Sequence, residues 1–225
     1  MRVEQCDVGE AAHARRLVAA TRAPSIDGVW HAAGVLADAT LPKQDTPGLA
    51  RVYAPKAHGA WALQRGTAAL PLEACALFSS VAALLGNAGQ ANYAAANSCL
   101  DALAGARRGA ALAGVSVQWG PWAEVGMAAG GAVHARLQAQ GWGLVGLAEG
   151  LAALGLAVGG AAPPVVAMMP VSWGRVLGGG VVPPFLSAFK AHSPAAAAVQ
   201  SATSGPAAAV SLETVLALAA RTAAF

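Results

Sequence analysis

Short apolar runs alternate with longer stretches of helical pattern along most of this 225-residue chain. The apolar runs cover residues 26–33, 74–79, 115–119 and 165–169, and the helical patterns cover residues 10–21, 47–66, 90–109 and 144–157. Nearly continuous apolar strands are typical of a parallel sheet covered by helices on both faces, and helices of this length connect parallel strands. The alternation therefore predicts an α/β layered fold.

Composition limits what this fold can contain and bind. Alanine and glycine contribute 60 and 27 residues, so the 56% hydrophobic share includes few bulky side chains, yet 225 residues suffice for one ordinary domain. The hydrophobic share and the 11% of charged residues exclude compositional disorder for most of the chain. The net charge is only +3, and the nearest approach to a cluster of basic residues is the pair Arg107-Arg108. A nucleic-acid partner is therefore not expected.

Membrane, metal and disulfide roles are also disfavoured. The uncharged stretch 150–169 contains four glycines and the pair Pro163-Pro164, so a membrane helix is not expected there. The N-terminus has no apolar run typical of a secretory signal. Three cysteines without a CxxC pair or a His/Cys cluster predict no disulfide framework and no metal site. We expect a cytoplasmic chain in a reducing compartment.

The composition changes near the C-terminal end. Residues 1–190 are predicted to form one domain that is incomplete at its N-terminus. Residues 191–210 are rich in Ala, Ser and Pro and are predicted to be a linker. Residues 211–225 begin a further helix with Ser211 as a candidate N-cap, and they resemble the opening of a truncated carrier-protein domain. They lack the serine motif that would accept a phosphopantetheine arm.

Four polar residues are candidates for chemistry. Ser80 follows the apolar run 74–79, and Tyr93 lies thirteen residues later, after a glycine-containing loop. Asn97 is one helical turn beyond Tyr93, and Lys56 lies on the preceding helix. In α/β sheets, reactive groups gather beyond the carboxyl ends of the strands.

The chemistry of this set is coherent. A neighbouring ammonium would lower the pKa of Tyr93 from its ordinary value near 10 and prepare it for proton transfer. The Ser80 hydroxyl could hold a substrate carbonyl oxygen, and Asn97 could anchor a water or orient Lys56. Taken singly, these residues are more typical of a cap, a packing tyrosine or a solvated lysine. The set at these spacings favours protonation of a ketone oxygen.

Four segments carry a resemblance to a known family. They are HAAGVLADATL (31–41), PKAHGAWAL (55–63), LFSSVAALLGNAGQANYAAAN (77–97) and VQWGPWAEVGMA (117–128). Together they resemble the ketoreductase domain of modular type I polyketide synthases, a relative of the short-chain dehydrogenases/reductases. The similarity extends from about residue 2 to residue 186. The ketoreductase of animal-type fatty acid synthases is the family most easily confused with it.

The resemblance implies a Rossmann-like sheet and NADPH-dependent reduction of a β-ketoacyl thioester on an acyl carrier protein, beside other synthase domains. It implies that Tyr93 is the proton donor, that Ser80 orients the carbonyl, and that Lys56 and Asn97 complete the set. Most short-chain dehydrogenases carry lysine where Asn97 stands here, and the exchange is typical of this ketoreductase subfamily. A generic dehydrogenase is therefore disfavoured.

The resemblance also implies a cofactor site and a stereochemical outcome. Its candidate NADPH-binding residues are Asp7 near the adenine, Ala32, Ala33 and Gly34 beside the ribose, and Pro121 and Trp122 over the nicotinamide. Leu36-Ala37-Asp38 keeps the last aspartate of the Leu-Asp-Asp motif of B-type enzymes, and Leu85 stands where A-type enzymes carry tryptophan. We expect the D-configured alcohol. From the residues alone, Asp38 could equally be an N-cap or a loop residue.

One departure from the family is large. Its glycine-rich TGGxGxLG-type turn, which binds the cofactor phosphates, has no counterpart after a strand in this sequence. Residues 2–8 resemble the end of the family's third strand. We therefore expect a sheet that lacks its middle, with an unpaired edge at Val29, a detached N-terminal segment and weak NADPH binding. A catalytically silent structural module or gene fragment is the alternative interpretation.

Overall fold

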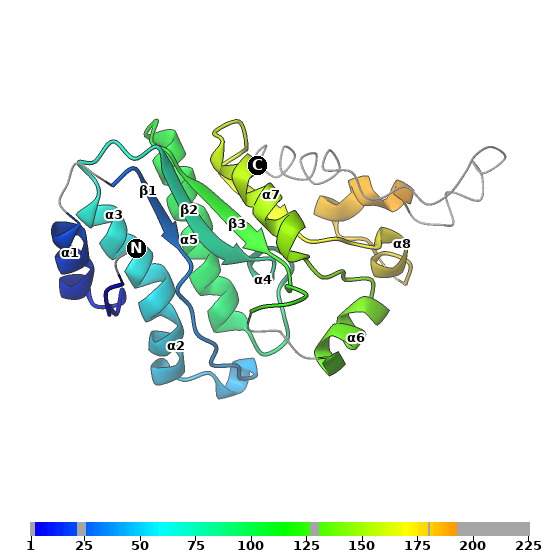
Figure 1. The fold of residues 1–225 in the computed structure, drawn as a ribbon. Coiled ribbons are helices and arrows are strands. Elements are labelled where there is room, and N and C mark those ends of the chain that lie inside the picture. The colour runs from blue at the N-terminus through cyan, green and yellow to red at the C-terminus, as the bar shows by residue number, and fades with distance from the viewer. Residues whose placement is uncertain (1–2, 22–25, 127–130, 180, 193–225) are drawn as a thin grey trace. The chain divides into compact units, whose positions relative to one another are not determined.

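The computed structural model describes residues 3–21, 26–126, 131–179 and 181–192 (Figure 1). Its strands are β1 (Gly28–His31), β2 (Ala74–Ser80), β3 (Val115–Trp119) and β4 (Val165–Met168). Its α-helices are α1 (Ala11–Ala20), α2 (Thr46–Tyr53), α3 (Gly59–Gly66), α4 (Ala82–Leu85), α5 (Ala91–Gly109), α6 (Gly131–Ala139), α7 (Leu147–Val158) and α8 (Trp173–Val176). A π-helical turn, η2 (Ala54–His58), joins α2 to α3, and 3-10 segments occupy η1 (Leu41–Lys43) and η3 (Pro184–His192).

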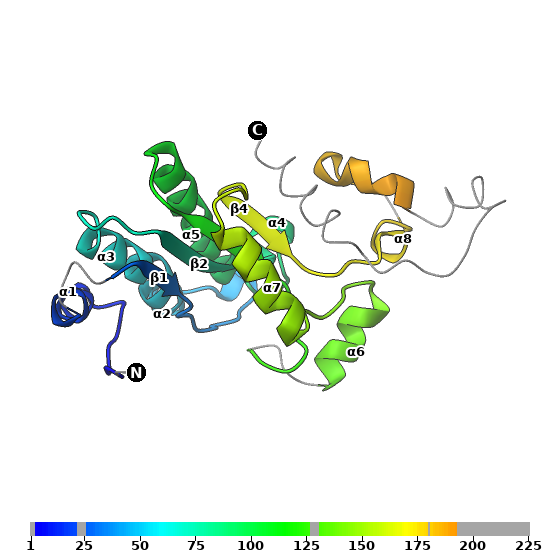
Figure 2. The same ribbon diagram turned by 45° about the horizontal axis from the view of Figure 1, so that its top comes forward.

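The strands form one sheet in the order β1-β2-β3-β4 (Figure 1 and Figure 2). The β1–β2 and β2–β3 pairs are parallel, with Val29 opposite Cys75 and Phe78 opposite Val117. The predicted α/β fold class is confirmed, and every predicted strand is present. β1 is an edge strand, as expected for the strand at Val29. Residues 3–8 form no strand of this sheet, and Val8 lies against Gly59 at the start of α3.

The chain divides into two compact units. Among the described residues, the first unit lies within 3–119 and 153–167, and the second lies within 120–152 and 168–192. The predicted linker from residue 193 onward and the helix at 211–225 lie outside the described residues. Of the described helices, none combines the length and the apolar character needed to cross a bilayer.

In the first unit, α5 packs on β2 and β3 (Figure 1). Leu77 of β2 and Leu100 of α5 are at most 2% exposed and share a cluster with Leu103. Alanines at 60 and 104 complete the contact, and their small side chains let the helices approach the sheet closely. Truncating either fully buried leucine to alanine would cost roughly 2–5 kcal/mol.

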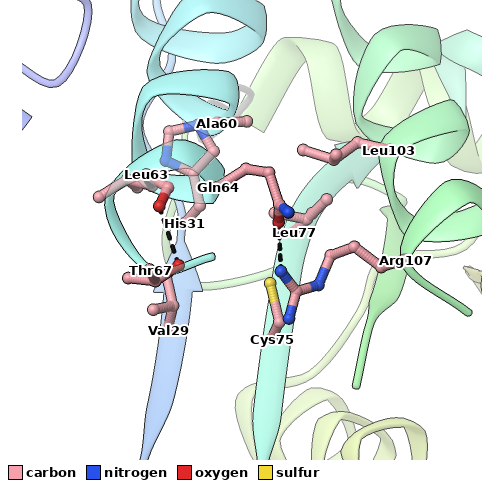
Figure 3. A pocket seen from close by; sticks show the side chains of 10 residues that line it. All are labelled: Val29, His31, Ala60, Leu63, Gln64, Thr67, Cys75, Leu77, Leu103 and Arg107. Carbon is pink, nitrogen blue, oxygen red and sulfur yellow. Dashed lines mark hydrogen bonds between the residues drawn. The ribbon is translucent and has the colours of Figure 1, made fainter. Parts of the chain in front are cut away.

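Arg107 is a buried arginine that ties α5 to its neighbours. Its guanidinium donates to the Gln64 side chain of α3 and, over 2.6 Å, to the carbonyl of Ala113, beside the cavity drawn in Figure 3. Gly114 leaves room for this side chain, because a Cβ there would lie 2.9 Å from the Cβ of Arg107. These contacts brace the end of the sheet opposite Ser80.

The second unit is built around tryptophans. The Trp122 ring lies against Gly150, where a side chain would collide with it. Residues Pro121 and Ala123 exchange backbone hydrogen bonds with Val145, at 2.8 and 2.9 Å. The rings of Trp173 and Phe189 stack with their centroids 4.2 Å apart.

Ala111 lies in the connection from α5 to β3 with a φ of +58°. This left-handed conformation costs an L-residue other than glycine roughly 1 kcal/mol. We predict that Ala111→Gly raises the free energy of unfolding by about 0.5 kcal/mol in urea denaturation, after the greater chain entropy of glycine is counted. Ala110→Gly is the control, since Ala110 has a φ of −92° and should gain nothing. Equal effects of the two substitutions would contradict this account.

Candidate active site

The end of β2 and the start of α5 bring Ser80 and Tyr93 together. Ser80 is the last residue of β2, and its hydroxyl accepts a 3.2 Å hydrogen bond from the amide of Ala82. Tyr93 lies in the first turn of α5 and is 7% exposed. Burial raises the pKa of Tyr93, and a side-chain hydrogen bond with Ser80 is among the influences that oppose this rise.

Asn97 lies one turn after Tyr93 and is fully buried. Its side-chain Nδ2 donates to the backbone carbonyl of Tyr93 over 2.8 Å. Its backbone carbonyl accepts a hydrogen bond from the Ser79 hydroxyl over 3.4 Å. Its Oδ1 is buried and accepts no hydrogen bond from the described residues. Such an orphaned acceptor suits the predicted role of anchoring a water.

Lys56 reaches the same place from a distorted helix. The sequence predicts one helix over residues 47–66, whereas the structure has two α-helices joined by the π-helical turn η2. Pro55 explains the difference, because proline has no N–H and its ring collides with the carbonyl four residues earlier in a regular α-helix. Lys56 follows directly, and it is only 3% exposed.

The Lys56 ammonium is held on the main chain of β2. Its Nζ donates to the Phe78 carbonyl over 3.0 Å and lies 5.3 Å from the centroid of the Tyr93 ring. Gly34 adjoins it, since a Cβ there would lie 2.8 Å from Cε of Lys56. Burial lowers the pKa of Lys56 to about 8, although the negative charge of Asp101 opposes this change.

The expected effect of Lys56 on Tyr93 is not found. Burial is the main influence on Tyr93 and raises its pKa above the ordinary value, while hydrogen bonds with Asn97 and Ser80 oppose the rise. The prediction that the ammonium lowers this pKa is therefore wrong for the chain by itself. The physical reason is that Lys56 lies over the face of the ring, bonded to Phe78, while the phenol is withdrawn from water.

His31 is a site residue that the sequence analysis missed. It ends β1, is 3% exposed, and its Nε2 lies 3.1 Å from the Lys56 carbonyl. A carbonyl can only accept, so Nε2 carries the proton. This bond fixes the backbone of the π-helical turn. Its place in the HAAG motif was the available signal, but a lone histidine in an apolar run gives no sign of its partner.

Asp38 lies near Tyr93, at the start of α5. Its carboxylate accepts a 3.0 Å hydrogen bond from Gln90, just before α5, and its charge contributes to raising the pKa of Tyr93. The Asn92 side chain donates to the carbonyl of Ala37 over 2.8 Å. The segment around Asp38 is therefore fastened to the start of α5, and Asp38 does not cap a helix.

The candidate cofactor residues are distributed over both units. Ala32, Ala33 and Gly34 follow β1 directly, and Gly34 contacts Lys56. Asp7 is exposed, and its carboxylate accepts from the Gly9 amide over 2.9 Å in a turn before α1. Pro121 and Trp122 belong to the second unit.

The fit to a dinucleotide is therefore partial. Gly34 and the Tyr93 ring both adjoin the Lys56 side chain, so the groups expected around the reactive end of a nicotinamide cofactor lie together. No glycine turn between a strand and a helix is present in the described residues to hold the phosphates. Residues 141–146, GWGLVG, match GxGxxG in letters, but they follow α6, and Pro170 fills the space beside Gly143.

Comparison with known proteins decides the family. Residues 1–124 match the family model described as the KR domain, which is more than half of the chain. The chain belongs to this ketoreductase family. The expectation from the sequence, a ketoreductase domain of modular polyketide synthases, is confirmed.

Similar sequences and structures agree. Polyketide synthase GfsB of Streptomyces halstedii is 43% identical over 171 residues, which are 76% of this chain and 3% of that protein. The phthioceranic/hydroxyphthioceranic acid synthase of Mycobacterium bovis (strain BCG / Pasteur 1173P2) is 46% identical over 126 residues, 55% of this chain and 6% of that protein. A solved A-type ketoreductase from a modular polyketide synthase superposes with a TM-score of 0.72 at 33% identity, covering 87% of this chain and 41% of that one. The ketoreductase chain thus spans a small part of these curated relatives.

The buried ammonium makes a testable prediction about stability. Folding lowers the pKa of Lys56 from 10.5 to about 8, so the unfolded chain holds the additional proton between these values. The lysine therefore costs about 3 kcal/mol of folding free energy near neutral pH, and this cost disappears as the pH rises from about 8 to 10.5. We predict that the stability difference between Lys56→Met and the parent chain changes by about 2 kcal/mol between about pH 7.5 and pH 10, in favour of the parent.

Urea denaturation at several pH values measures this difference. Subtracting the Lys56→Met curve removes the opposing contributions of Cys75 and Tyr93, whose raised pKa values make stability fall above about pH 9. Lys43→Met is the control, because Lys43 is exposed. Parallel stability curves for Lys56→Met and the parent would show that the lysine is not buried in its charged form.

Proposed function

We propose that this chain carries the catalytic residues of a ketoreductase that reduces a β-ketoacyl thioester to a β-hydroxyacyl thioester with NADPH. The substrate is presented by an acyl carrier protein within a larger synthase. The supporting observation is the convergence of Tyr93, Ser80, Lys56 and Asn97 at the carboxyl end of β2. Family membership supports the reaction class.

Proton transfer is the part of the reaction that these residues perform. Ser80 donates a hydrogen bond to the β-keto oxygen and holds it beside Tyr93. Tyr93 gives its phenolic proton to that oxygen as the carbonyl carbon is reduced. When bound, NADPH supplies the hydride to this carbon. Tyr93 is protonated at neutral pH, as a proton donor must be, but its raised pKa makes it a weaker acid in the free chain.

Lys56 and Asn97 support the donor. An ammonium 5.3 Å from the ring centroid stabilises the phenolate left after the transfer. Asn97 holds the start of α5 through the Tyr93 carbonyl and offers its free Oδ1 to a water that returns the proton. Asp38, fastened beside Tyr93, is proposed to select the B-type approach that gives the D-configured alcohol.

A second candidate function is a catalytically silent structural module. The observation that favours it is the absence of a glycine-rich turn after any strand in the described residues. Without such a turn, the cofactor phosphates lack the backbone N–H groups that usually bind them. For this reason we expect the 225 residues to bind NADPH weakly even if they are active.

The test combines cofactor binding with turnover. We predict weak NADPH binding in a fluorescence titration, slow reduction of a simple β-ketoacyl thioester, and mainly the D-alcohol by chiral chromatography. Tyr93→Phe should lower kcat by about 100-fold or more, because it removes the transferred proton. Tyr53→Phe, which removes the chain's other tyrosine, should leave kcat unchanged.

The outcomes separate the two functions. Turnover that survives in Tyr93→Phe would contradict the catalytic proposal. A folded chain that shows no NADPH binding and no turnover would favour the silent module.

A further inference from the structure

Polar side chains lie between α5 and the sheet, beyond the four catalytic candidates; those on β3 are buried, and the one on α5 is partly buried. Asp101 of α5 is at the centre of this group, one helical turn after Asn97 and two turns after Tyr93. The Asp101 carboxylate accepts a 2.6 Å hydrogen bond from the Ser116 hydroxyl and a 2.8 Å bond from the Gln118 amide, both on β3. Ser116 is fully buried and Gln118 is 7% exposed.

Asp101 differs from the other acidic side chains. Within the described ranges, it is the one Asp or Glu that is partly buried, whereas the others are exposed. Lys56 is correspondingly the buried lysine, whereas Lys43 and Lys190 are exposed. An ammonium withdrawn from water requires a nearby negative charge or a shift toward its neutral form.

The strand register places these opposite charges at the same level of the sheet. Lys56 donates to the carbonyl of Phe78 on β2, and Phe78 lies opposite Val117 on β3. Ser116 and Gln118, which hold the Asp101 carboxylate, flank Val117. Ser79, on the same face of β2, bonds to α5 through the Asn97 carbonyl. The two charges therefore lie over neighbouring strands on the face covered by α5.

We propose that Asp101 is a positioning residue that supplies the counter-charge keeping Lys56 protonated beside Tyr93. Ser116 and Gln118 fix the carboxylate so that it acts through space, without forming an ion pair that would draw the ammonium away from the tyrosine. This inference rests on the proposed function only in giving Lys56 the role of stabilising the Tyr93 phenolate. The charge pairing itself stands without any reaction.

Other titratable groups lie near Lys56, and a test must distinguish their effect on its titration from that of Asp101. His31 approaches from β1, and burial lowers its pKa, so it is neutral near neutral pH. Tyr93 approaches from α5, and its raised pKa keeps it neutral in the same range. The arginines of the adjoining helices, Arg51 in α2 and Arg65 in α3, are exposed. Asp38 also lies near Tyr93, but it is exposed. Asp101 is the anion whose charge opposes the fall in the pKa of Lys56.

Lysine-selective NMR can measure the effect directly, since the chain has three lysines and two are exposed internal references. The parent Lys56 should titrate with a midpoint of about 8. In Asp101→Asn, the midpoint should fall by about one pH unit, because the neutral amide retains the shape but not the charge. Glu73→Gln removes an exposed acid and should leave the Lys56 midpoint unchanged.

Asp101→Glu provides a second variant that keeps the charge. Its Lys56 midpoint should stay within about half a pH unit of the parent value. An unchanged midpoint in folded Asp101→Asn, or a fall of about one unit in Asp101→Glu, would overturn the proposal. If Asp101→Asn does not fold, Asp101→Ala, which also removes the charge, takes its place, and an unchanged Lys56 midpoint there would equally overturn the proposal.

The same variants distinguish this inference from the proposed function. If the parent chain reduces no β-ketoacyl thioester but the Lys56 midpoint falls in Asp101→Asn, the function fails and the role of Asp101 stands. If the chain is active, the alkaline limb of its pH–rate profile should move down by the same shift as the Lys56 midpoint. A purely structural role for Asp101 would lower the rate at every pH without moving that limb.

Discussion

The hydrogen bond from the Lys56 ammonium to the Phe78 carbonyl determines how the site is assembled. Through this bond the charged end of a helical side chain rests on the main chain of β2, beside the Tyr93 ring. A buried ammonium is costly unless its surroundings compensate it. Three local features make the placement possible: the π-helical turn after Pro55, the bond from His31 to the Lys56 carbonyl, and the missing side chain at Gly34.

The same arrangement keeps Tyr93, the proposed proton donor, in its protonated form. Tyr93 is buried by the packing that brings Lys56 over its ring, and withdrawal from water raises its pKa more than its hydrogen bonds lower it. Reduction requires the protonated phenol. Burial therefore keeps the phenol neutral and protonated. In the proposed reaction, the nearby ammonium stabilises the phenolate that forms after the transfer.

The sequence predicts most of the fold and the membership of the site. The strands are confirmed because continuous apolar runs identify a buried parallel sheet, and helices 91–109 and 147–158 follow from their apolar pattern. The break at Pro55 was missed because helical periodicity continues across it. The sign of the pKa change at Tyr93 and the partners of His31 depend on burial and on contacts between residues far apart in sequence, which a linear pattern does not contain.

The central claim is that burial, rather than the ammonium, governs the pKa of Tyr93, the proposed proton donor, in the free chain. The chain has two tyrosines, so ultraviolet titration of the Tyr53→Phe variant reports on Tyr93 alone. The account predicts a phenol midpoint above 10, the ordinary value. A midpoint below 10 would contradict it and would show that Lys56 already stabilises the phenolate before any ligand is bound.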